Sequence, residues 1–159
     1  SSVVRSNCHA ATMLTFDDFE AGTVYPLGSV DVDEAEVLEF AGRFDPQPFH
    51  TDPVAAAETH FGGVVASGWH TCSMCMRLFV DGLLRDTTSM GSPGVDEIRW
   101  PHPVRPGDRL TGTYTVISTR ASTSKPDRGI VNAVWELRNQ DDVTVLTMHG
   151  MTMFARHPA

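Results

Sequence analysis

The chain has 159 residues, and its 12 basic and 20 acidic side chains give a formal net charge of −8. This length predicts one domain that buries one hydrophobic core. An acidic chain without a basic cluster is not expected to bind nucleic acid. Its apolar runs are all shorter than the roughly 20 residues that cross a membrane, so no membrane contact is expected.

Residues 1–12 read SSVVRSNCHAAT, with one arginine and no acidic side chain. This composition is loosely like a transit peptide, but the segment is short and lacks a clear amphipathic pattern. An upstream extension or a remnant of cloning explains it better. We therefore expect residues 1–12 to be disordered and residues 13–159 to form a single domain.

The first half of the folded region is predicted to contain one strand and two helices, at residues 24–32, 33–43 and 53–60. Asp33 is a plausible N-cap for the first helix. Pro53 suits the first position of the second helix. Between these two helices, Pro46 and Pro48 predict a stretch that stays out of any regular helix.

A long helix is predicted from Ser67 to about Leu84, with so few polar positions that protein should surround it on most sides. After it the pattern changes to strands, predicted at residues 95–100, 109–119, 129–139 and 143–155. One long helix, an early strand and four later strands indicate an α+β fold. We expect a curved antiparallel sheet wrapped around a central helix.

Two cysteines of this helix, Cys72 and Cys75, are spaced as CxxC. A zinc site would need a second pair of ligands, and a redox site would need a thioredoxin-like setting; neither is found in the sequence. Two small apolar side chains on one helix face explain the spacing better. Three cysteines without a disulfide pattern or a secretory segment favour a reducing compartment, and we expect a cytoplasmic protein.

The most informative stretch, residues 44–52, reads FDPQPFHTD. Asp45 and His50 stand five positions apart on it, and a carboxylate and an imidazole held close together can handle the proton and hydroxyl of one water. A plain turn at Asp45 and an N-cap role for Asp52 are the structural alternatives.

This stretch resembles the signature of the MaoC-like dehydratases, the (R)-specific enoyl-CoA hydratase branch of the hot-dog fold. The signature is Asp, any residue, Asn, Pro, an apolar residue, His, any residue, Asp. Gln47 departs from it where many members have Asn. Two further stretches are similar to family elements. One is Phe61-Gly62-Gly63 followed by Ala66-Ser67-Gly68, with Ser67 where His is frequent, and the other is the turn from Pro103 to Asp108. The resemblance implies a hot-dog fold.

The resemblance further implies reversible hydration of a trans-2-enoyl thioester, which we expect to be carried on CoA, to the (R)-3-hydroxyacyl product. Asp45 and His50 would activate the water. Gly68 at the start of the long helix would polarise the thioester carbonyl with its N–H, because the first N–H groups of a helix lack internal partners. A small residue at a tight junction is the alternative explanation of Gly68.

Five further residues are candidates for substrate binding: Gln47, Ser67, Trp69, Arg99 and Arg105. Gln47 and Ser67 would order the catalytic loop, with Ser67 as the N-cap of the long helix. The two arginines are the candidate local positive groups for an anionic CoA, and an ordinary solvated arginine is the alternative explanation of each. Trp69 could line the pocket or belong to the core.

We expect no metal and no cofactor, since no paired-acid or His-x-x-x-His pattern occurs. The resemblance implies a homodimer or a larger homo-oligomer. Two other functions remain open: acyl-CoA thioester hydrolysis on the same fold, and a domain that only binds acyl carriers. The Asp-x-x-x-x-His stretch favours hydration over both.

Overall fold

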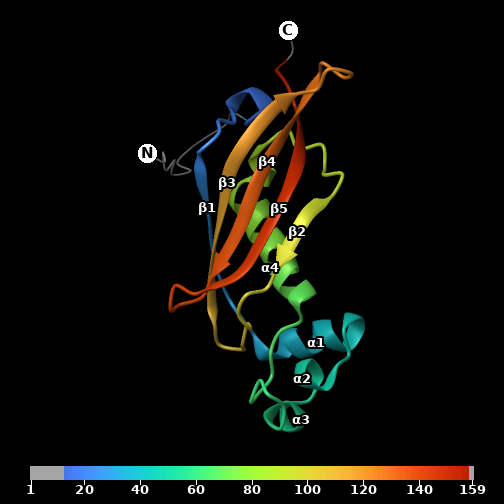
Figure 1. The fold of residues 1–159 in the computed structure, drawn as a ribbon, viewed down its shortest axis with the longest axis vertical. Coiled ribbons are helices and arrows are strands. Elements are labelled where there is room, and N and C mark those ends of the chain that lie inside the picture. The colour runs from blue at the N-terminus through green and yellow to red at the C-terminus, as the bar shows by residue number, and fades with distance from the viewer. Residues whose placement is uncertain (1–12, 158–159) are drawn as a thin grey trace.

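The structure is a computed structural model that describes residues 13–157; the expectation for residues 1–12 lies outside the described residues. A sheet of five strands and one long helix form the body of the molecule, and three shorter helices gather beyond one end of the sheet (Figure 1). The strands are β1 (Val24–Asp31), β2 (Val95–Arg99), β3 (Arg109–Ala121), β4 (Arg128–Arg138) and β5 (Thr144–Ala155). The helices are α1 (Glu34–Phe44), α2 (Pro48–Thr51), α3 (Pro53–Ala57) and α4 (Gly68–Gly82), with single 3-10 turns at Phe16–Asp18 and Leu84–Asp86.

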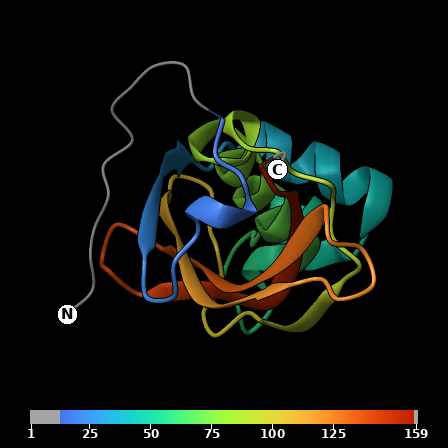
Figure 2. The same cartoon turned by 90° about the horizontal axis from the view of Figure 1, so that it is seen from above.

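The sheet runs in the order β1-β3-β4-β5-β2, and every neighbouring pair is antiparallel. Buried and partly exposed residues alternate along the whole of β4, as expected for a strand with one face on a core. Seen from above, the sheet curves around α4 (Figure 2). This is the hot-dog arrangement, so the predicted α+β fold is confirmed.

The core lies between the concave face of the sheet and one side of α4. Phe79 of α4 stacks on Tyr114 of β3, with ring centroids 4.8 Å apart, and meets the ring of Trp135 of β4 edge-on at 5.3 Å. Cys75 is fully buried, and burial raises the pKa of its thiol to about 12, which fits the predicted packing role. None of the helices within residues 13–157 combines the length and the apolarity needed to cross a membrane.

Three details of the helices differ from the predictions. The stretch with the two prolines contains the helical turn α2, because Pro48 occupies its first position, where no N–H is needed. The helix that begins at Pro53 ends at Ala57 rather than near His60. Protein does not surround α4 on most sides, since Trp69 and Met76 are exposed on it.

Candidate active site

Asp45 lies at the C-cap of α1, and three side chains meet its carboxylate. Gln47 donates from Nε2 to Oδ1 at 2.6 Å, and Ser67 donates from Oγ to Oδ2 at 2.7 Å. His50 Nε2 lies 3.3 Å from Oδ2. The donors come from positions 2 and 22 residues away in the chain, so the fold assembles this carboxylate site from two separate segments.

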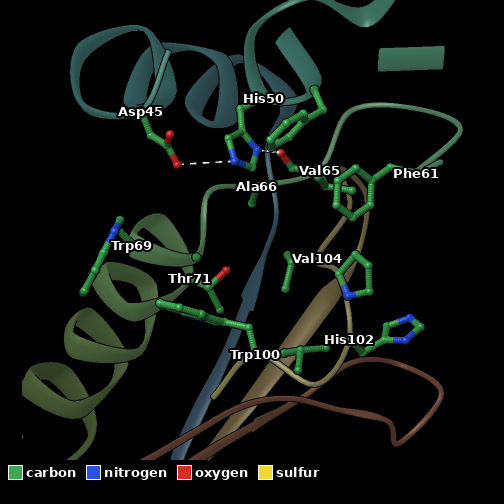
Figure 3. Close-up of a pocket in the computed structure, with 14 residues that line it drawn as sticks. Asp45, His50, Phe61, Val65, Ala66, Trp69, Thr71, Trp100, His102 and Val104 are labelled. Carbon is green, nitrogen blue, oxygen red and sulfur yellow. Dashed lines mark hydrogen bonds and ion pairs between the residues drawn. The ribbon is translucent and has the colours of Figure 1, made fainter. Parts of the chain in front are cut away.

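Two hydrogen bonds connect α2 to the segment that precedes α4. The Val65 N–H donates to the Phe49 carbonyl at 3.0 Å, and His50 Nδ1 lies 2.6 Å from the Val65 carbonyl oxygen. A carbonyl only accepts, so we assign the ring proton to Nδ1. In the neutral ring Nε2 is then an acceptor, and it faces Asp45 (Figure 3).

The carboxyl of Asp45 is held in its ionised form. Partial burial raises the pKa of Asp45, but the hydrogen bonds that the carboxylate accepts from Ser67 and Gln47 lower it. The pKa therefore lies below its ordinary value. A carboxylate that stays ionised and accepts hydrogen bonds can also accept a proton from a water held beside it.

Asp45 and His50, together called the dyad below, both border a pocket of about 320 Å³. Its other walls are mainly apolar, and Figure 3 shows Trp100 and Val104 across the pocket from Asp45 and His50. The lining residues are Asp45, Phe49, His50, Phe61, Val65, Ala66, Gly68, Trp69, Thr71, Trp100, His102, Pro103, Val104 and Val145. A concave apolar pocket with a few convergent polar groups is the usual form of a small-molecule site.

Gly68 is the first residue of α4 and lines this pocket. A Cβ at this position would come within 2.5 Å of the indole of Trp100, so the absence of a side chain makes room for that ring. Within residues 13–157, no hydrogen bond engages the Gly68 N–H. The space that a side chain at position 68 would occupy is thus filled by Trp100, whereas the Gly68 N–H stays available as a donor.

Ser67 precedes α4 but does not cap it with its side chain. Its hydroxyl is used by Asp45 instead, which corrects the expected N-cap role. Asp52, in contrast, is the N-cap of α3 and accepts from the N–H groups of Val54 and Ala55 at 3.0 and 3.1 Å.

The two arginines expected at the substrate lie outside the pocket lining. Arg99 is exposed and pairs with Glu97. Arg105 donates to the carbonyl of Phe61 at 2.5 Å, so it anchors the segment that carries one pocket wall. Trp69 does line the pocket and is 56 % exposed; its ring meets Trp100 edge-on at 5.5 Å.

Sequence reasoning did not identify the pocket wall after β2, which comprises Trp100, His102, Pro103 and Val104. The stretch WPHPV offers one signal, because two prolines alternate with larger side chains and fix an extended backbone. Ala66 N–H donates to the Val104 carbonyl at 2.8 Å, which brings this stretch against the start of α4.

Comparisons with known proteins agree with this architecture. A family model described as "MaoC like domain" matches residues 19–134. The chain is 29 % identical to the uncharacterized protein YdeM of Bacillus subtilis (strain 168) over 134 residues, which cover 83 % of this chain and 92 % of YdeM.

Among solved structures, the MaoC-like dehydratase from Rhodospirillum rubrum superposes with a TM-score of 0.84 at 38 % identity, over 92 % of this chain and 99 % of that one. The (R)-hydratase from A. caviae involved in PHA biosynthesis superposes with a TM-score of 0.70 at 25 % identity, over 87 % and 98 %. The hot-dog fold, the matched span and these neighbours together show that the chain belongs to the MaoC-like dehydratase family.

Proposed function

We propose that the protein catalyses the reversible hydration of a trans-2-enoyl thioester, carried on CoA, to the (R)-3-hydroxyacyl thioester. The observation that carries this proposal is the pair of acceptors, His50 Nε2 and Asp45 Oδ2, 3.3 Å apart at the wall of the pocket. The (R) configuration rests on the family and its (R)-hydratase neighbours.

Two acceptors at that separation suit one water that donates a hydrogen to each of them. The lone pairs of this water then point into the pocket, where C3 of the enoyl group would lie. In hydration, the water oxygen bonds to C3, one water proton passes to the dyad, and a proton is delivered to C2. The reverse sequence eliminates water from the 3-hydroxyacyl thioester.

The Gly68 N–H is the proposed donor to the thioester oxygen. Addition at C3 pushes electrons onto that oxygen, so a donor there lowers the energy of the enolate-like state. The N-terminus of the fifteen-residue helix α4 adds the positive end of its dipole. Gln47 and Ser67 hold the Asp45 carboxylate in place, and Trp69 belongs to the pocket mouth.

All groups in this scheme come from the protein, so we propose that neither a metal nor an organic cofactor takes part. Extensive dialysis against a chelator should leave turnover intact. Activity that is lost on dialysis and restored by zinc or magnesium would contradict this assignment.

We also propose that the protein works in the cytoplasm as a homodimer or larger homo-oligomer. Cys72 and Cys75 are both free thiols, as a reducing compartment requires. β2 is an edge strand of the sheet, and Trp100, just after it, and Trp69 of α4 are large exposed apolar side chains. A symmetric partner would cover both features. Size-exclusion chromatography with light scattering should give at least a dimer, and a stable monomer would contradict the assembly.

Incubation with crotonyl-CoA tests the function directly. Hydration predicts loss of the conjugated enoyl absorbance without release of free thiol. Release of thiol would instead identify a thioesterase, and binding without either change would identify a subunit that only holds acyl carriers. Either of these last two results would overturn the proposed reaction.

A further inference from the structure

A second histidine–carboxylate pair joins α1 to the first turn of α4, outside the pocket lining. His70 Nε2 lies 2.9 Å from Glu36 Oε1, and the imidazole stacks on the ring of Phe40, with centroids 4.8 Å apart and an interplanar angle of 11°. His70 is only 2 % exposed, although Glu36 itself is exposed. One buried side chain of α4 thus makes both a polar and a stacking contact with α1.

The direction of this hydrogen bond follows from the chemistry of the carboxylate. An ionised carboxylate oxygen only accepts, so the ring proton belongs on Nε2. His70 Nδ1 is buried and has no hydrogen-bond partner within residues 13–157. His70 therefore donates to Glu36, and any acceptor at the same position on residue 36 could serve.

The contact lies between the two elements that assemble the dyad. Asp45 caps the far end of α1, nine residues beyond Glu36, which is roughly 13 Å along a helix axis. Ser67, which donates to Asp45 at 2.7 Å, stands only three residues before His70. The hydrogen bond from Ser67 fixes one end of α1 to the start of α4, and the His70 contact fixes the other end.

We propose that His70 and Glu36 are positioning residues, which hold α1 on α4 so that the Asp45 carboxylate stays aligned with Ser67, His50 and the Gly68 N–H. This inference rests on the proposed hydration. Neither residue touches the pocket, so their effect passes through the placement of Asp45. A misplacement of about 1 Å at a reacting group can cost roughly 100-fold in rate.

The test compares three substitutions on one face of α1. Glu36→Ala removes the acceptor, and kcat for crotonyl-CoA should fall roughly 10-fold with little change in KM, because the pocket walls are unchanged. Glu36→Gln keeps an acceptor oxygen and should restore most of the lost kcat. Glu39→Ala, an exposed residue of the same helix, removes the same charge and should have no effect. Equal effects of Glu36→Ala and Glu39→Ala, or no rescue by Glu36→Gln, would overturn the proposal.

A second readout is independent of activity. In protein labelled with 15N-histidine, the ring-nitrogen resonances of His50 report its contact with Asp45. Glu36→Ala should shift these resonances, and Glu36→Gln should leave them near their wild-type positions. A wild-type protein that does not hydrate crotonyl-CoA would defeat the proposed function, whereas unshifted His50 resonances in Glu36→Ala would defeat the positioning role alone.

Discussion

The two histidine–carboxylate pairs at the ends of α1 consist of the same two kinds of group in different surroundings. His70 lies closer to Glu36 than His50 does to Asp45, at 2.9 against 3.3 Å. Yet Asp45 accepts from two further side chains and borders a pocket, whereas Glu36 is exposed to solvent. What distinguishes the proposed catalytic pair is therefore its setting: donors that keep the carboxylate ionised, and space for a substrate beside it.

The largest expected difference between the pairs is in turnover. His50→Ala removes one of the two groups that hold the water, and kcat should fall by roughly 10² to 10⁴, the usual range for a positioned acid or base. Losing the acceptor of the other pair should cost far less, as argued above for Glu36. Steady-state assays with crotonyl-CoA measure both. His149→Ala, at an exposed position on β5, is the matched control and should keep full activity.

A smaller change in turnover should follow when a hydrogen bond to Asp45 is removed and both Asp45 and His50 are kept. Ser67→Ala removes a donor to the carboxylate, so the pKa of Asp45 should rise from its lowered value. The base must be ionised to accept a proton. As the pH is lowered, the variant should therefore lose activity at a higher pH than the wild type does. Turnover at neutral pH should fall roughly 10-fold, as expected for one hydrogen bond to a charged group.

The pH profile of kcat/KM is the decisive measurement for this variant, because it reports the ionisation of the free enzyme. Ser73→Ala is a suitable control, since its hydroxyl binds the carbonyl of Trp69 within the same helix. An acid limb that stays in place in Ser67→Ala would show that the hydroxyl does not act through Asp45.

Asp52 provides a further comparison with Asp45, because it is a carboxylate of the same stretch that has no histidine partner. It caps α3, so Asp52→Ala should lower the free energy of unfolding by about 1 kcal/mol and leave turnover nearly unchanged. Asp52→Asn should keep both, because asparagine caps a helix equally well. Chemical denaturation and the crotonyl-CoA assay separate the two effects. A large loss of turnover in Asp52→Ala would give this residue a role that its contacts do not explain.

The sequence predicted best what depends on local periodicity. The alternation of buried and partly exposed residues along β4 and the apolar face of α4 both follow from neighbouring residues in the sequence. The predicted bounds of both elements agree with the structure within two residues. Asp45 and His50 were found through a motif of eight residues. The helical turn α2 departs from the prediction because proline, which breaks a helix in its interior, is favoured at a first helical position.

Other features depend on segments that meet only in the folded chain. Serine is a residue type that commonly caps helices, but the hydroxyl of Ser67 donates to Asp45 instead, because the fold brings that carboxylate close to it. The indole of Trp100 fills the space that a side chain at position 68 would need, although the two residues are 32 positions apart in the chain. His70 and Glu36 are 34 positions apart. No local pattern contains such pairings, so the site's supporting contacts could not be predicted as its two central residues were.

The central claim, that Asp45 and His50 act as one unit on one water, is tested most directly by a double-mutant cycle on crotonyl-CoA hydration. Asp45→Asn and His50→Ala should each reduce kcat by roughly 10² to 10⁴, and the double variant should lose little more than the worse single one. Unchanged circular dichroism and oligomeric state serve as the control for folding. Losses that multiply in the double variant, or near-normal hydration by Asp45→Asn, would contradict the account.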